Sequence, residues 1–232
     1  MTEGTTLTLV GFSVLCGISF VGSFIAASLG LGGGLLVLAT MTLFLPPTVL
    51  IPVHAVVQIG SNGFRALLMR REILTSVIPA FLLGTLLGSW LGGLTIFALE
   101  VWVLQSILGI FVLYATWTPK FRSSNPGPAK FFGCGVFGGF ATMFVGGTGP
   151  LVAPFVNAAC KERQQVVATH ASLMTLQHHT TCSNIIYVSD AIYPQATLDG
   201  DIGLFLRKTN QSVPLSLSFR SVSLSICEGP LG

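Results

Sequence analysis

Two histidines occupy matching positions in two similar segments of this chain. His54 lies near the end of GLGGGLLVLATMTLFLPPTVLIPVHA, residues 30–55, and His170 lies near the end of GGTGPLVAPFVNAACKERQQVVATHA, residues 146–171. Each segment begins with a glycine cluster, which interrupts a helix, and continues through a short apolar stretch. Because an unperturbed imidazole titrates near neutral pH, the pair could carry protons, or the rings could stay neutral and donate hydrogen bonds.

One constant offset relates the two segments. The histidines are 116 positions apart (170 − 54), and no gap is needed to align the segments. The offset pairs Gly22 with Gly138, Phe24 with Phe140, Gly30 with Gly146, Gly33 with Gly149, Leu35 with Leu151 and Ala55 with Ala171. The chain therefore contains an internal duplication, with a first repeat at about residues 8–97 and an incomplete second repeat at about residues 127–180.

Further residues follow each histidine at helical spacing. Gln58 and Asn62 come one and two turns after His54, so they share its face of a helix. In the second segment, Met174 and His178 occupy the corresponding positions.

The composition indicates a lipid bilayer as the solvent of these segments. Hydrophobic residues make up 51% of the 232 residues and charged residues 8%, whereas soluble domains carry roughly 25% charged residues. The mean hydropathy is +0.80. Apolar runs suited to crossing a hydrocarbon core occur at 7–29, 73–97 and 101–117, and shorter or interrupted runs at 31–45, 51–69, 131–145 and 151–160. We therefore expect an all-α membrane protein, a polytopic helical bundle with two inverted repeats and glycine-broken helices.

Basic residues between the apolar runs predict the orientation and the inversion. They fall in three clusters, at residues 65–71, 120–130 and 161–163, and cytoplasmic loops are enriched in Lys and Arg. Two crossings separate successive clusters, so all three can lie in the cytoplasm, which places the N-terminus and the loop at Glu100 outside. An odd number of crossings separates the two glycine clusters, so the repeats are expected to point in opposite directions.

Inverted repeats with glycine interruptions at matching positions are typical of secondary transporters that work by alternating access. Irregular backbone at membrane depth must be buried in protein or line a wet cavity, and a helix that restarts after glycines presents unpaired N–H groups that attract an anion. We predict a site for a small anionic substrate, with proton coupling through the two histidines. The predicted substrate-binding residues are Gly32, Gly33, Gly34, His54, Gln58, Asn62, Thr148, Gly149, Pro150, His170 and Gln177.

Other residues receive a structural interpretation. Gly84, Gly88, Gly92 and Gly93 have the small-xxx-small spacing that lets membrane helices pack closely. We expect Arg65 to be an interfacial residue whose guanidinium reaches the membrane surface.

The two segments resemble a known family. ASLGLGGGLLVLATMTLFLPPTVLIPVHA, and GGFATMFVGGTGPLVAPF followed by ATHASLMTLQH, are similar to the two signature segments of the TauE/SafE sulfite exporter family, and the resemblance covers about residues 8–179. It implies a multi-pass carrier in the plasma membrane of a bacterium. The implied substrates are sulfite, sulfur-containing organic anions or other small organic anions.

The C-terminal part departs from this resemblance. Residues 179–232 contain no uncharged apolar run of 18 residues, although the family leads us to expect further helices. We expect a transporter domain at residues 1–180 and an aberrant, disordered polar tail at residues 181–232, as a truncation or a shifted reading frame would produce. A native soluble tail is the alternative.

Other functional classes have less support in the sequence. A non-functional truncated copy of a transporter and an anion channel are the alternatives to a working carrier. An enzyme is not expected, because no carboxylate lies between Glu100 and Glu162 and no nucleophile with a base stands out. We expect no cofactor, no metal and no nucleic-acid partner, since the net charge of +3 is spread over loops.

Overall fold

The computed structural model describes residues 9–29, 33–45, 47–96, 99–117 and 126–192. The chain divides into two compact units, one formed by residues 9–185 and the other by residues 1–8 and 186–232. Of the second unit the structure describes residues 186–192, which are helical. The residues of the candidate site lie in the first unit.

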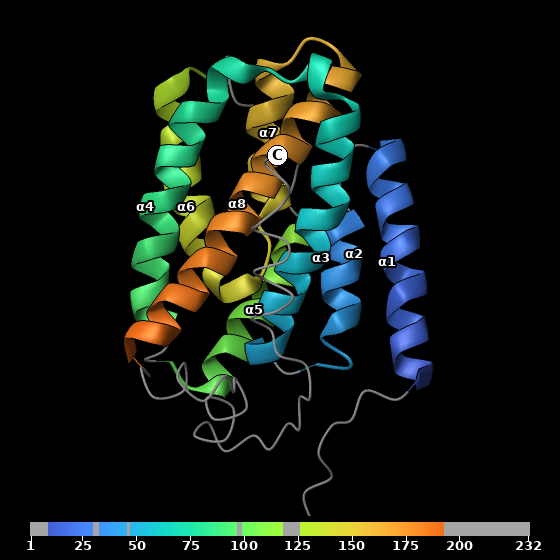
Figure 1. The fold of residues 1–232 in the computed structure, drawn as a ribbon, viewed down its shortest axis with the longest axis vertical. Coiled ribbons are helices and arrows are strands. Elements are labelled where there is room, and N and C mark those ends of the chain that lie inside the picture. The colour runs from blue at the N-terminus through green and yellow to red at the C-terminus, as the bar shows by residue number, and fades with distance from the viewer. Residues whose placement is uncertain (1–8, 30–32, 46, 97–98, 118–125, 193–232) are drawn as a thin grey trace, which may run out of the picture. The chain divides into compact units, whose positions relative to one another are not determined.

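The described residues form α-helices, as the composition predicts. In chain order they are α1 (Leu9–Leu29), α2 (Gly33–Met41), α3 (Pro47–Leu68), α4 (Ile78–Ile96), α5 (Val101–Trp117), α6 (Pro128–Val145), α7 (Gly149–Ala159) and α8 (Arg163–Ile192), with 3-10 turns η1 (Arg70–Glu72) and η2 (Thr75–Val77) before α4. The prediction of an all-α bundle is confirmed for this part of the chain (Figure 1).

Two helices are short because glycines precede them. α2 begins at Gly33 and α7 at Gly149, and the helices that follow them begin at Pro47 and Arg163. Both pairs of starting residues differ by 116 positions (149 − 33 and 163 − 47), so the offset found in the sequence is also an offset between helix boundaries. The second break is visible in full, because α6 ends at Gly146 in the left-handed conformation with φ 76°, which glycine adopts at little cost.

The two short helices run in opposite directions. In Figure 1, α2 descends toward the lower end of the unit, whereas α7 ascends toward its upper end. The same upper end holds the C-terminal end of α3 and the N-terminal end of α6. Apart from Arg65, which lies inside α3, the described basic residues of the three sequence clusters lie at helix ends that share this end of the unit, as the predicted topology requires.

Glycines bring α4 and α6 into close contact. A Cβ atom at Gly84 or Gly88 would overlap the backbone of α6, and one at Gly139 would lie 2.6 Å from the carbonyl oxygen of Thr85 on α4. At Gly92 a Cβ atom would lie 2.9 Å from the carbonyl oxygen of Phe140. Such distances permit no side chain, so the packing interpretation of Gly84, Gly88 and Gly92 is confirmed.

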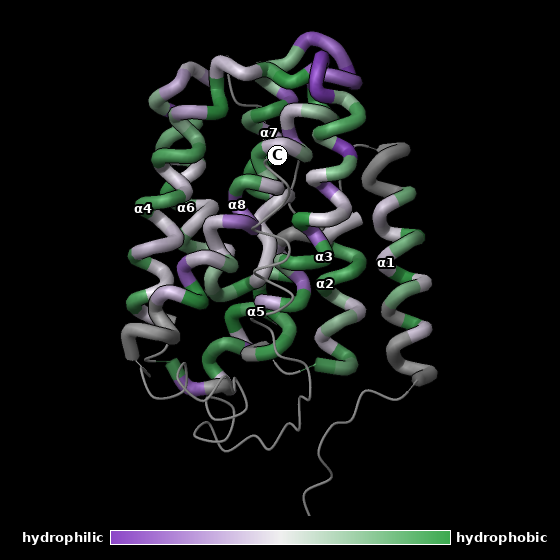
Figure 2. Tube along the Cα trace, viewed as in Figure 1, coloured by the Kyte–Doolittle hydropathy of each residue, from purple (hydrophilic) through white to green (hydrophobic). Residues whose placement is uncertain are grey.

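Apolar side chains cover much of the outside of this unit. Large exposed side chains include Phe20, Phe24, Phe64, Leu83, Trp102, Ile110 and Phe137, and Figure 2 shows that hydrophobic residues recur along most helices. By length and composition, the helical stretches Thr75–Thr95 and Pro128–Val145 are apolar enough to cross a membrane. An apolar exterior is what a lipid-facing surface requires.

The last described helix continues beyond the predicted end of the transporter domain. The expected boundary at residue 180 falls inside α8, which extends to Ile192, so residues 181–192 are helical. The rest of the expected tail, residues 193–232, lies outside the described residues.

Candidate functional site

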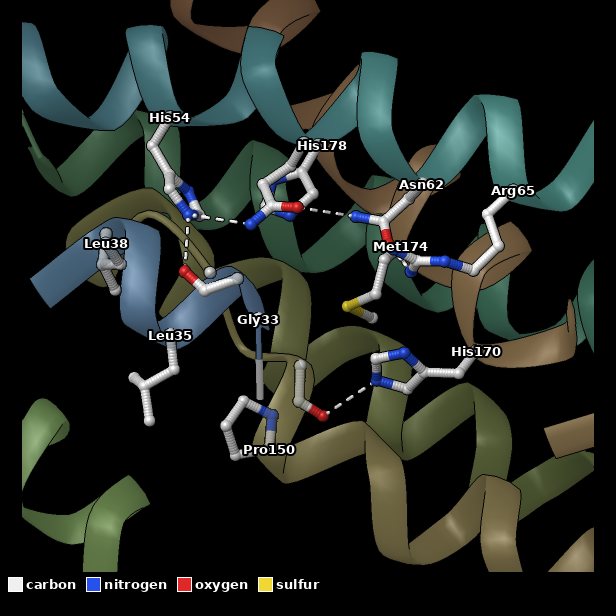
Figure 3. Close-up of a pocket in the computed structure, with 14 residues that line it drawn as sticks. Gly33, Leu35, Leu38, His54, Asn62, Arg65, Pro150, His170, Met174 and His178 are labelled. Atoms are coloured by element: carbon white, nitrogen blue, oxygen red, sulfur yellow. Dashed lines mark hydrogen bonds between the residues drawn. The ribbon is translucent and has the colours of Figure 1, made fainter. Parts of the chain in front are cut away.

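Both broken segments meet at one small cavity inside the first unit. Its lining comes from α2, α3, the turn before α7, α7 and α8, and Figure 3 shows these side chains around it. The lining residues are Gly33, Gly34, Leu35, Leu38, His54, Gln58, Asn62, Arg65, Gly147, Gly149, Pro150, His170, Met174 and His178. The cavity measures about 40 Å³, which is room for about three water-sized groups.

The lining repeats the offset found in the sequence. Five pairs of lining residues are 116 positions apart: Gly33 with Gly149, Gly34 with Pro150, His54 with His170, Gln58 with Met174 and Asn62 with His178. Equivalent positions of the duplicated segments therefore contribute to one cavity. All eight of Gly33, Gly34, His54, Gln58, Asn62, Gly149, Pro150 and His170 were predicted from the sequence to bind substrate.

Three predicted residues do not belong to this lining. Gly32 lies outside the described residues. Thr148 and Gln177 are fully buried, and both bond to the end of α6 instead of facing the cavity. Thr148 Oγ1 lies 2.9 Å from Thr142 Oγ1, and Gln177 Nε2 donates to the carbonyl oxygen of Gly138 over 3.1 Å. These bonds link α6, α7 and α8 near the break, while Gln177 Oε1 has no hydrogen-bond partner among the described residues.

A continuous chain of hydrogen bonds runs along the cavity face of α3. Arg65 Nη1 donates to Asn62 Oδ1 over 3.0 Å, and Asn62 Nδ2 donates to Gln58 Oε1 over 2.9 Å. Gln58 Nε2 then lies 3.1 Å from His54 Nε2. The four side chains are one helical turn apart, at i, i+4, i+8 and i+11, which places them on one face. Figure 3 shows His54, Asn62 and Arg65 in a row along this helix.

His54 also connects the two broken segments. Its Nδ1 lies 2.8 Å from the carbonyl oxygen of Gly146, and its Nε2 lies 3.1 Å from the carbonyl oxygen of Gly34. The side chain is 1% exposed. One buried ring therefore contacts backbone at the start of α2 and at the end of α6.

The two histidines of α8 are bonded less completely. His170 Nε2 lies 3.1 Å from the carbonyl oxygen of Gly149. His178 is 2% exposed, and its Nδ1 has no hydrogen-bond partner among the described residues. Its ring stands edge-on to that of His54, with 5.6 Å between the ring centroids. A buried polar atom without a hydrogen-bond partner lowers the stability of the fold. A ligand in the cavity could supply the hydrogen bond that His178 Nδ1 lacks.

The charges and dipoles of the lining attract anions. Arg65 supplies a positive charge, and it is 9% exposed, with Nη2 donating to the carbonyl oxygen of Ser23 over 3.3 Å. Within the described residues, neither Asp nor Glu contributes to the lining. The first residues of α2 and α7, Gly33 and Gly149, add two helix N-termini, whose N–H groups and dipoles favour negative charge. In the same part of the chain, no group of three His, Cys, Asp or Glu is placed to hold a metal ion.

Several lining residues were missed by the sequence prediction. Arg65 was expected at the membrane surface, but its side chain turns into the cavity because Asn62 and the backbone of α1 accept its hydrogen bonds. Its spacing from His54 was a usable signal, since both fall on one face of α3. The same spacing rule could have identified His178, which lies two turns after His170 on one face of α8.

The comparisons with known proteins agree with this architecture. A family model described as Sulfite exporter TauE/SafE matches residues 15–198, which is more than half of the chain. No curated protein and no solved structure matches.

Proposed function

The chain belongs to the sulfite exporter TauE/SafE family of membrane transporters, and from this premise we propose that it carries small anions through the cavity between α2 and α7. The main support for this proposal is the set of groups that line the cavity. Arg65, two helix N-termini and the uncommitted His178 Nδ1 converge on a buried space that has no carboxylate among its described lining residues. Such a site stabilises negative charge and repels cations.

The size of the cavity favours a compact substrate. Room for about three water-sized groups suits sulfite or the sulfonate group of a small organic anion better than a long chain. The many donors in the lining, from guanidinium, amide and imidazole groups, match an anion with several oxygen atoms around one centre.

Alternating access between inverted repeats is the proposed mechanism. It is supported by the opposite directions of α2 and α7 in Figure 1 and by the offset of 116 positions shared by helix starts and cavity residues. In such carriers the substrate site lies where the broken helices of both halves meet. We further propose a plasma-membrane location with the N-terminus outside, supported by the basic residues at one end of the unit.

Proton coupling is part of this proposal. Three histidines line the cavity, and a titratable side chain at membrane depth is a functional group by default. An anion that enters beside them favours their protonated forms, because opposite charges attract more strongly in a medium of low dielectric constant.

Flux measurements test the proposed function. The full chain is reconstituted in proteoliposomes, and uptake of radiolabelled sulfite is compared with that of empty liposomes. A carrier gives saturable uptake that unlabelled sulfite inside the vesicles accelerates. Uptake that rises linearly with concentration would identify an anion channel, and uptake equal to that of empty liposomes would identify a non-functional copy.

A further inference from the structure

The hydrogen bonds along α3 have a fixed direction. Arginine has only donors, so Asn62 must accept from Arg65 with Oδ1 and present its Nδ2 to Gln58. Gln58 then accepts with Oε1 and presents its Nε2 to His54. His54 Nε2 therefore accepts this bond and carries no proton, and the proton of the neutral ring is on Nδ1.

The other end of the chain requires the same direction. His54 Nδ1 faces the carbonyl oxygen of Gly146 at 2.8 Å, and a carbonyl oxygen can only accept. The ring must donate there. The Arg65 guanidinium at one end of the chain can only donate, and the Gly146 carbonyl at the other end can only accept. The neutral His54 ring therefore has one allowed arrangement, with its proton on Nδ1.

A competing acceptor lies beside the same nitrogen. The carbonyl oxygen of Gly34 is 3.1 Å from His54 Nε2. While Nε2 is unprotonated, it cannot donate a hydrogen bond to this carbonyl. If Nε2 takes up a proton, it donates to Gly34 and can no longer accept from Gln58. The Gln58 amide is then left without its acceptor, and it already lines the cavity.

We propose that protonation of His54 makes Gln58 available as a hydrogen-bond donor to the anion. When His54 Nε2 is protonated, it donates to the Gly34 carbonyl, and the Gln58 amide is released to donate into the cavity. This inference rests on the proposed function for the identity of the ligand. The step transfers one proton from a hydronium ion to Nε2, leaves a water molecule and breaks no other covalent bond. Anion and proton thereby favour one another's binding.

The surrounding charges give the sign of this coupling. The other titratable or charged groups among the described lining residues are Arg65 on α3 and His170 and His178 on α8. Without an anion, a protonated His54 would be repelled by a charged His178, whose ring centroid lies 5.6 Å away, and by Arg65, about three helical turns along α3. A bound anion reverses the balance, so the proton is taken up together with the anion.

Histidine nitrogen spectra test the hydrogen-bond chain without any ligand. In the full chain labelled with 15N-histidine, the signals of His54 are identified as those lost in His54→Gln. Wild-type protein at neutral pH is expected to show the Nδ1–H tautomer. In Asn62→Asp the carboxylate cannot donate to Gln58, so the Gln58 amide reverses and His54 Nε2 becomes protonated. A wild-type Nε2–H tautomer, or an Asn62→Asp spectrum unchanged from wild type, would overturn the proposal.

A matched variant controls for the added charge. Asn184→Asp introduces the same charge at a partly buried amide on α8, which bonds to Ser89 and to the carbonyl oxygen of Thr180. It lies outside the chain from Arg65, so its His54 spectrum should equal that of wild type. An equal shift in both variants would show a general field effect and contradict the chain.

Anion binding at several pH values tests the release of Gln58. Sulfate is the probe, because its charge stays constant between about pH 5 and 8, where histidine titrates. Wild type should bind it more tightly as the pH falls, by up to about tenfold per pH unit for one proton per anion. Gln58→Met should bind sulfate with a weaker pH dependence than wild type, reduced to the part that His170 and His178 contribute, while Gln105→Met, at an exposed position on α5, should keep the full dependence.

The outcomes separate this inference from the proposed function. If Gln58→Met keeps the pH dependence of wild type, the gating role is wrong even though an anion binds. If wild type binds no sulfate and moves no sulfite, the proposed function and the release step are both overturned, and the tautomer is decided by the spectra alone.

Discussion

His54 Nδ1 and the carbonyl oxygen of Gly146 lie 2.8 Å apart, although the residues are 92 positions apart in the chain. The imidazole belongs to the helix of the first repeat, and the carbonyl ends the interrupted helix of the second repeat. A single hydrogen bond therefore ties the cavity face of one repeat to the backbone break of the other. Movement of one repeat against the other must keep or break this bond.

Replacing His54 by leucine should destabilise the protein. The change leaves the buried Gly146 carbonyl and the Gln58 amide without a partner, and each such loss costs about 1–3 kcal/mol. In detergent, the thermal unfolding temperature should fall by several degrees. Gln105→Leu, at an exposed position on α5, is the control. Equal unfolding temperatures for the two variants would mean that the bond to Gly146 contributes no stability.

The left-handed conformation at Gly146 predicts a graded response to substitution. Its φ of 76° disfavours side chains, so Gly146→Ala should cost about 1–2 kcal/mol, whereas Gly146→Asn should cost less, because asparagine tolerates this region. Chemical unfolding of the purified variants measures the difference. Gly133→Ala, where a Cβ atom would meet nothing within 4 Å, should be neutral or stabilising. An alanine variant at Gly146 as stable as that at Gly133 would contradict the geometry.

Close packing of α4 on α6 should be sensitive to one methyl group. A Cβ atom at Gly88 would overlap the backbone around Val136, so the helices must separate, at a cost of about 1–3 kcal/mol. Gly88→Ala should lower both the unfolding temperature and the yield of monodisperse protein. At Gly109 on α5 a Cβ atom would meet open space, and Gly109→Ala serves as control. No loss in Gly88→Ala relative to this control would disprove the close contact.

The predicted orientation can be measured at two exposed residues on opposite ends of α3. Leu43 precedes this helix and is 78% exposed, and Arg71 follows it in η1. Single cysteines at these positions, in a chain without its five native cysteines, are treated with an impermeant maleimide on intact cells. Leu43→Cys should react at once and Arg71→Cys only after permeabilisation. The reverse pattern would invert the topology.

Much of the fold could be predicted because a lipid environment requires long apolar segments to be helical. Long apolar runs must be helical in lipid, so α1, α4 and α5 follow from composition. The start of α2 and of α7 follows from Gly33 and Gly149, whose duplication at a fixed offset marks both breaks. The extension of α8 to Ile192 was missed, because polar residues such as Asn184 argue against a helix in lipid when their partners are unknown. In the structure that side chain bonds to Ser89 on α4.

The candidate site was only partly predictable because rotation of a helix is set by packing. Spacing from His170 places His178 on the same face, yet the prediction chose its neighbour Gln177, which points to α6 and bonds to Gly138. One position changes the direction of a side chain by about 100° on a helix of 3.6 residues per turn. Arg65 was misjudged because a charge near a helix end usually reaches the membrane surface, and only tertiary contacts show that it turns inward.

Binding of sulfite to wild type and to Arg65→Gln tests most directly whether this cavity is the anion site. Calorimetry on the full chain in lipid nanodiscs gives both affinities, with Arg70→Gln, exposed in η1, as the charge-matched control. Removing the one arginine of the described lining should weaken binding at least about tenfold, equivalent to 1.4 kcal/mol, while Arg70→Gln binds as wild type does. Equal affinities of wild type and Arg65→Gln would contradict the proposed site.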